Sequence, residues 1–192
     1  MGNGNSFKHL KTKEVNELIK STKFTVEEIH KWHGHFVKEC PKGRLGKVEF
    51  QDIYSHVFPL GNPEKFSGFV FNVFDKNGDG TISFQEFIMA LSITSRGNVD
   101  EKLDWAFKLY DIDKDGHISR EEMTEIISAI VEMVGPNHGL STLSAKSKAN
   151  QIFDSMDCNK DGYLTADEFR ICAKKDPWIV HALAMDPAYL HR

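Results

Sequence analysis

The sequence lacks the features that mark secreted, membrane-spanning or disulfide-stabilised proteins. It has only three cysteines among 192 residues, and an odd, scattered set (Cys40, Cys158 and Cys172) argues against a disulfide framework. No run approaches the roughly 18 apolar residues that a membrane-spanning helix needs, and residues 1–6 are small and polar, unlike a signal peptide. We therefore expect reduced thiols and a protein that is cytoplasmic or peripheral on the cytosolic face of membranes.

The sequence also lacks the usual signatures of catalysis and of nucleic-acid binding. It shows no nucleophile–base set, no glycine-rich phosphate loop and no basic aromatic surface. A cluster of His30, His33 and His35 invites a zinc interpretation, but His35 faces away from the other two on a helix and no cysteine pair joins them. We therefore expect neither an enzyme nor a nucleic-acid-binding protein.

The most informative feature that is present is an internal repeat. Asp75, Asp111 and Asp157 each begin a D-x-[DN]-x-D-G segment that ends in Glu at the twelfth place and is followed by an apolar residue. A fainter copy ends at Glu49. Such repeats are typical of EF-hand helix–loop–helix units. The sequence therefore predicts an all-α fold of four units in two paired lobes, with short β contacts between loops.

Calcium is a hard cation that takes six to eight oxygen ligands, which a 12-residue loop supplies from places 1, 3, 5, 7, 9 and 12. The glutamates at place 12 are also expected to close helix-capping boxes, but capping does not require carboxylates upstream at fixed spacing. We therefore predict three Ca²⁺ sites, in which place 7 contributes its backbone carbonyl. The predicted ligands are Asp75, Asn77, Asp79, Thr81, Ser83 and Glu86 in the second loop; Asp111, Asp113, Asp115, His117, Ser119 and Glu122 in the third loop; and Asp157, Asn159, Asp161, Tyr163, Thr165 and Glu168 in the fourth loop.

The first loop, residues 38–49, has lost its ligands. Lys38, Cys40 and Lys42 fall at places 1, 3 and 5, where a lysine would repel calcium. Gly43 at place 6 and Leu45 at place 8 keep the turn and the pairing residue. We expect this loop to support the second loop without binding metal.

The domain organisation follows from the repeat and from a polar, glycine-containing stretch at mid-chain. We expect an acylated basic segment over 1–23, a first EF-hand pair over 24–91, a linker over 92–99, a second pair over 100–175, and a C-terminal helix and tail over 176–192. Predicted helices cover 26–38, 63–74, 100–110, 120–134, 146–156, 167–173 and 177–184.

The N-terminus carries a modification motif. Gly2 with Ser6 fits the N-myristoylation pattern. The lysines at 8, 11, 13, 20 and 23 outnumber the nearby glutamates, and a single acyl chain needs such a second signal to hold a membrane. We expect a membrane anchor at Gly2.

The first pair is rich in aromatic residues, more than a four-helix lobe needs for its core. When calcium opens an EF-hand pair, such side chains can line a groove for an amphipathic helix of a target protein. The predicted groove residues are Trp32, Phe36, Phe50, Ile53, Tyr54, Phe58, Phe87 and Leu91. A cytosolic calcium buffer, a constitutive regulatory subunit of a kinase or phosphatase, and a weak homodimer stay open as alternatives.

Several further motifs resemble those of the neuronal calcium sensors (frequenin, recoverin, visinin-like and hippocalcin-type proteins). They are Gly2 with Ser6, Cys40-Pro41-x-Gly43, Phe71-x-x-Phe74-Asp75, Ser95-Arg96-Gly97, Trp105-Ala106-Phe107-x-x-Tyr110-Asp111 and Asp176-Pro177-x-Ile179-Val180. The resemblance covers essentially the whole chain. It implies a myristoylated, two-lobed, all-helical calcium sensor whose partners are membrane-associated kinases, cyclases, channels or receptor regulators.

Overall fold

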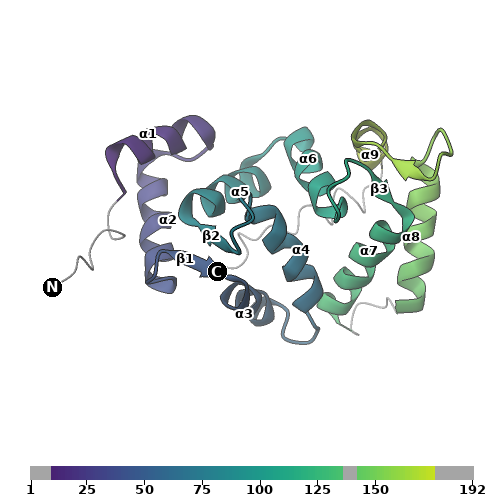
Figure 1. Ribbon diagram of the computed structural model, residues 1–192, viewed down its shortest axis with the longest axis horizontal. Helices are drawn as coiled ribbons and strands as arrows, with labels where there is room; N and C mark the ends of the chain where they lie inside the picture. The colour runs from purple at the N-terminus through teal and green to yellow at the C-terminus, as the bar shows by residue number, and fades with distance from the viewer. Residues whose placement is uncertain (1–9, 136–141, 176–192) are drawn as a thin grey trace.

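The computed structural model describes residues 10–135 and 142–175, which form short helices joined by loops (Figure 1). The elements of the first half are α1 (Thr12–Ser21), α2 (Val26–Glu39), β1 (Arg44–Gly46), α3 (Lys47–Val57), α4 (Glu64–Phe74), β2 (Thr81–Ser83) and α5 (Phe84–Arg96). Those of the second half are α6 (Val99–Tyr110), β3 (Ile118–Ser119), α7 (Arg120–Val134), α8 (Thr142–Met156), β4 (Tyr163–Leu164) and α9 (Ala166–Ala173). The predicted all-α class is confirmed.

The strands join the loops in pairs. β1 and β2 run antiparallel with Leu45 opposite Ile82, and β3 and β4 run antiparallel with Ile118 opposite Leu164. All four of these side chains are buried. The first loop is thus tied to the second and the third to the fourth, each through the apolar residue at place 8.

Capping boxes start helices α2, α5, α7 and α9. The Thr25 hydroxyl accepts the Glu28 amide at the start of α2, and Ser83, Ser119 and Thr165 do the same for α5, α7 and α9. In each case the glutamate returns a bond to the cap residue's own amide, so two free donors of the helix end are satisfied at once. These boxes explain why the predicted starts of α2 and α7 agree with the structure.

Helix α5 remains helical through Arg96, five residues into the stretch predicted to be a polar break. Its polar residues have distant partners that the local sequence does not reveal. Ser92 is buried and its hydroxyl accepts the Lys23 amide at 2.8 Å. Arg96 donates to the Lys23 carbonyl at 2.9 Å and stacks over Phe24 at 4.5 Å. The non-helical connection to α6 is therefore only Gly97 and Asn98.

The starts of two other helices, α8 and α4, also differ from the sequence prediction. Helix α8 begins at Thr142, earlier than the predicted 146, because buried Ala145 continues the apolar stripe of Ala149 and Ile152. Pro63 is the N-cap of α4 and not its first helical residue. The helix expected over 177–184 lies outside the described residues.

Helix α1 occupies part of the predicted basic segment. Val15 and Leu18 are its buried residues, and the helix packs against α2 and α5. Its lysines and Glu17 are exposed, whereas Glu14 is partly buried. None of the described helices combines the length and apolar character needed to cross a membrane.

The two halves meet where two glycines let backbone touch backbone. The Asn62 amide, in the connection before α4, donates to the Glu132 carbonyl in α7 at 2.8 Å. A Cβ at Gly61 would overlap the Met133 carbonyl oxygen, and a Cβ at Gly135 would lie 2.6 Å from the Leu60 carbonyl oxygen. Figure 1 shows α4 beside α7 at this junction. A side chain at either glycine would therefore push the halves apart.

We expect Gly61→Ala to lower the free energy of unfolding by about 1–3 kcal/mol, as for overpacked sites. The matched control is Gly34→Ala on α2, where a Cβ meets nothing within 4 Å. The control should raise the free energy of unfolding by about 0.5–1 kcal/mol, because alanine is more stable than glycine in a helix interior. Urea unfolding followed by circular dichroism measures both. Equal stability of the two variants would contradict the close approach.

Candidate calcium sites

Each predicted binding loop bridges two helices in the same way. Asp75, Asp111 and Asp157 directly follow the last residues of α4, α6 and α8, and the closing glutamates lie in the first turns of α5, α7 and α9. The first and last ligands are therefore positioned by helix ends. The residues between them turn the chain and supply the remaining predicted ligands.

The turn at place 6 orients the carboxylate at place 1. The glycines there have φ of +80°, +89° and +86°, the left-handed region where a side chain would be strained. Their amides donate to the place-1 carboxylates, Gly80 to Asp75 at 2.8 Å, Gly116 to Asp111 at 3.1 Å, and Gly162 to Asp157 at 3.1 Å.

Backbone amides also orient the ligands at places 3 and 5. In the third loop the Asp115 amide donates to Asp113 Oδ1 at 3.1 Å, and the His117 amide donates to Asp115 Oδ1 at 2.8 Å. Carboxylate oxygens of Asp111, Asp113 and Asp115 lie within 4.8 Å of one another. Like charges held this close repel, so the arrangement favours a cation at their centre.

The glutamate at place 12 closes each loop. Glu122 Oε2 accepts the amide and hydroxyl of Ser119, both at 2.8 Å, while Oε1 accepts the Ile112 amide at 2.8 Å and the Asp113 amide at 3.3 Å. Glu86 makes similar bonds to Ser83 and to the Asn77 amide. Hydrogen bonds thus hold both oxygens of the carboxylate at the loop.

Two place-1 oxygens have no hydrogen-bond partner among the described residues. Asp111 Oδ1 and Asp157 Oδ1 are buried and unpaired. Burial raises the pKa of the Asp111 carboxyl, the Gly116 amide opposes this, and the Glu122 and Asp115 carboxylates raise it further. A buried carboxylate oxygen without a partner is costly, and a hard cation is the partner that these oxygen donors suit. The residues therefore fit Ca²⁺.

The backbone conformation at place 4 was not predicted from the sequence. Gly78, Lys114 and Lys160 all have positive φ, at 70°, 64° and 59°. Glycine adopts this conformation readily, whereas lysine is strained there. Two loops thus hold a strained residue next to their ligands, and only the repeat itself could have signalled it.

The first loop has the turn without the ligands. Gly43 keeps a positive φ of 74°, and Lys38 and Lys42 are exposed. Cys40 is buried, and burial together with the nearby Glu49 and Glu39 carboxylates raises the pKa of its thiol to about 11. A protonated thiol and two ammonium groups provide none of the oxygen donors that calcium requires.

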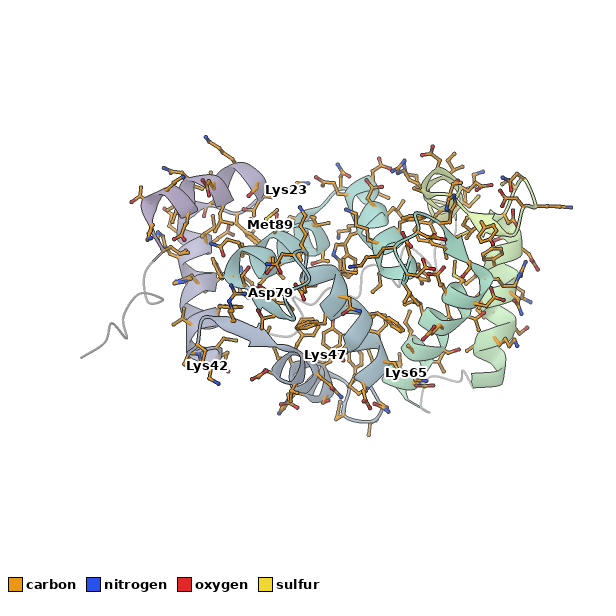
Figure 2. The ribbon with its side chains drawn as sticks, in the orientation of Figure 1. Lys23, Lys42, Lys47, Lys65, Asp79 and Met89 are labelled. Atoms are coloured by element: carbon orange, nitrogen blue, oxygen red, sulfur yellow. The ribbon has the colours of Figure 1, made fainter. Side chains whose placement is uncertain are left out.

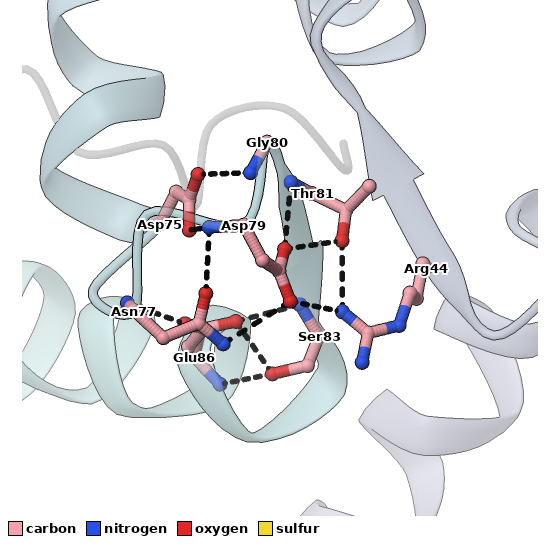
Figure 3. Close-up of polar contacts among 8 residues, drawn as sticks. All are labelled: Arg44, Asp75, Asn77, Asp79, Gly80, Thr81, Ser83 and Glu86. Atoms are coloured by element: carbon pink, nitrogen blue, oxygen red, sulfur yellow. Dashed lines mark hydrogen bonds and ion pairs between the residues drawn. The ribbon is translucent and has the colours of Figure 1, made fainter.

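The first loop nevertheless reaches the second through Arg44 at its place 7. Arg44 Nη1 donates to Asp79 Oδ2 at 2.6 Å and to Thr81 Oγ1 at 2.8 Å (Figure 3). Hydrogen bonds from Thr81 and then from Arg44 lower the pKa of the Asp79 carboxyl to about 2. Sequence reasoning missed this residue, although the pairing of Leu45 with the second loop implied a neighbouring contact.

The predicted groove residues form one connected set. Phe36, Phe50, Tyr54 and Leu91 are buried, whereas Trp32, Ile53, Phe58 and Phe87 are partly buried and packed on the core. Phe74 on α4 connects the rings of α3 with those of α5. Its ring centroid lies 5.4 Å from that of Phe50 and 6.4 Å from that of Phe87. The aromatic rings thus run continuously from α2 through α5 and α4 to α3.

A pocket of about 390 Å³ adjoins this set between α4, α5 and α6. Its lining includes Val73, Met89 (labelled in Figure 2) and Trp105, together with the loop ligands Asp75 and Glu86. The indole nitrogen of Trp105 is buried, and no residue in the part of the chain that the structure describes accepts a hydrogen bond from it. None of the three apolar residues was among the predicted groove residues.

Comparison with known proteins supports the interpretation of the loops as parts of EF hands. A family model for an EF-hand domain pair matches residues 100–174, and one for an EF hand domain matches residues 68–94. The chain is 50% identical over 178 residues to neuronal calcium sensor 1 of Lymnaea stagnalis, covering 92% of this chain and 93% of that protein. It has the same identity and coverage against neuronal calcium sensor 1 of Aplysia californica.

We expect Glu122→Gln to weaken calcium binding at the third loop by at least about tenfold, because an anionic bidentate ligand becomes neutral. Glutamine can still accept the capping bonds, so the helix should stay intact. Calorimetric titration with calcium measures the loss as one fewer tight site. The control Glu121→Gln removes the same charge from an exposed neighbour, and a similar loss there would contradict the assignment.

Proposed function

Because this chain belongs to the neuronal calcium sensor family, we propose that it is a calcium-dependent regulator with three working loops. On filling, these loops expose an apolar groove of the first pair to a target protein. The observation that carries the proposal is a set of hydrogen bonds, repeated in three loops, in which backbone amides orient carboxylates around a common centre. These carboxylates include the buried, unpaired oxygens of Asp111 and Asp157.

Charge supports a response to calcium. The ligand carboxylates number three in the second loop, four in the third and three in the fourth. Three bound Ca²⁺ ions would change the formal net charge from −4 to +2. Binding therefore relieves repulsion within the loops and favours approach to anionic surfaces.

The coupling from metal to groove runs through adjacent residues on α5. Glu86 closes the second loop, and Phe87 follows it directly. The Phe87 ring lies 5.5 Å from Phe36 and 6.1 Å from Trp32. When the ion draws Glu86 inward, α5 must move with it, and Phe87 then shifts against α2. This is the opening of an EF-hand pair that exposes apolar side chains.

The proposed target is an amphipathic helix of a membrane-associated kinase, cyclase, channel or receptor regulator. Aromatic rings supply large contact areas, and such a helix lays its apolar face into a hydrophobic groove. The eight groove residues predicted from the sequence remain our candidates for its floor, with the pocket beside Trp105 extending it toward the second pair.

Membrane attachment is proposed at Gly2, which lies outside the described residues. Helix α1, whose lysines are exposed, packs against α2 and α5 of the first pair. One acyl chain binds membranes only marginally, so the basic residues would provide the second contact. Attachment would make the protein peripheral on a cytosolic membrane surface as well as cytoplasmic.

The alternative function is a calcium buffer, since buffer EF-hands barely open. Burial of Phe36, Phe50, Tyr54 and Leu91 in this structure favours it. A constitutive regulatory subunit would bind its partner whether or not calcium is present. Both alternatives predict no calcium-dependent gain in apolar surface.

We expect the double variant Glu86→Gln with Glu122→Gln to abolish a calcium-dependent rise in the fluorescence of an apolar dye. The physical reason is that neither α5 nor α7 is then drawn toward an ion. Wild-type protein and the Glu121→Gln control should keep the rise. A calcium-dependent rise that persists unchanged in the double variant would contradict this coupling through Glu86 and Glu122. A rise that is missing from the wild type would favour the alternatives.

We expect Gly2→Ala to remove membrane attachment, because N-myristoylation requires an N-terminal glycine after removal of Met1. Protein co-expressed with an N-myristoyltransferase is sedimented with vesicles of mixed neutral and anionic lipid. The variant should lose the mass increment of the myristoyl group and most of the bound fraction. Equal sedimentation of both proteins would show that the acyl chain is dispensable.

A further inference from the structure

We propose that Arg44 of the first loop competes with calcium for Asp79 and so lowers the calcium affinity of the second loop. This inference rests on the proposed function, in which the second loop binds calcium. It assigns a task to a residue whose own loop holds no metal ligands.

The contact falls on the oxygen that the ion would need. Asp79 Oδ1 is occupied within its own loop, because it accepts the Thr81 amide at 2.9 Å and the Thr81 hydroxyl at 2.6 Å. The other oxygen, Oδ2, remains to face the ion. Arg44 Nη1 donates to this Oδ2 at 2.6 Å, and Asn77 donates to it at 3.2 Å (Figure 3).

The other loops lack such a contact. The corresponding carboxylates at place 5 are Asp115 and Asp161, whose Oδ1 atoms accept the amides of His117 and Tyr163. Within residues 10–135 and 142–175, neither forms an ion pair with a lysine or arginine. The difference between the second loop and the other two is therefore a cation supplied from outside the loop.

The pairing of the loops explains why the cation comes from the first loop. In β1, Arg44 pairs with Ser83, next to Leu45 opposite Ile82. This register places the Arg44 side chain over the second loop. Because the first loop has no ion to repel, an arginine at its place 7 costs its own loop nothing. A cation in the same position of a working loop would act against two sites.

The direction of the effect follows from charge. An arriving Ca²⁺ must displace the guanidinium from Asp79 Oδ2 and then remain near its positive charge. The ion pair is partly exposed, with side-chain exposures of 51% for Arg44 and 36% for Asp79, so solvent screens much of the repulsion. We therefore expect removal of Arg44 to tighten calcium binding at the second loop by roughly three- to tenfold.

The experiment isolates the second loop in the full-length chain. Glu122→Gln and Glu168→Gln together disable the third and fourth loops, and calcium binding at the remaining loop is then measured by calorimetry. Arg44→Ala is added to this background. The matched control is Lys42→Ala, which removes the same charge from an exposed residue of the same loop (Figure 2). Within the described residues, Lys42 makes no ion pair with the second loop.

Arg44→Ala should tighten calcium binding at the second loop by about three- to tenfold, whereas Lys42→Ala should change it less than about twofold. The difference in calcium affinity between the two variants should become smaller in higher salt, because exposed charges are screened. Equal affinity with and without Arg44, or weaker binding without it, would overturn the inference while leaving the second site in place. Equal gains from both variants would also overturn it, because a general charge effect would then suffice. Absence of binding with and without Arg44 would instead overturn the proposal of a working second loop, and this inference with it.

Discussion

The antiparallel pairing of neighbouring loops is the constraint on which the rest of the structure depends. Leu45 against Ile82, and Ile118 against Leu164, fix each loop to its partner through buried apolar side chains and a short ladder of backbone hydrogen bonds. A loop that loses its ligands therefore keeps its position as long as it keeps this ladder. The first loop is such a case, since its turn and its pairing residue remain while two lysines and a buried thiol occupy ligand places.

The pairing also explains how metal chemistry and the aromatic core communicate. Each closing glutamate belongs both to a loop and to the first turn of a helix, where it completes a capping box. The same carboxylate thus serves the backbone and would serve the ion. The next residue points into the apolar core, as Phe87 does beside Phe36. The residue that would bind the ion and the residue that packs in the core are therefore neighbours in the chain.

Much of the fold was predictable because its signals are local. The D-x-[DN]-x-D-G repeat located the loops, and the capping boxes at Thr25 and Ser119 located the starts of α2 and α7. Features that depend on distant partners were not predictable. Ser92 and Arg96 look like linker residues until Lys23 is seen to bind both of them. Arg44 looks like an ordinary surface cation until the strand register places it on Asp79. The left-handed lysines at 114 and 160 escaped notice because lysine carries no preference for that conformation.

The junction between the two halves depends on the absence of a side chain at two positions. At Gly61 and Gly135 the backbones approach so closely that any Cβ meets a carbonyl oxygen. Every substitution at these glycines adds atoms, so mutation can loosen this contact but can hardly improve it. This junction therefore cannot be changed in small steps by substitution at these two positions during evolution. We expect descendants of this chain to retain both glycines together or to evolve a different way of holding their two halves.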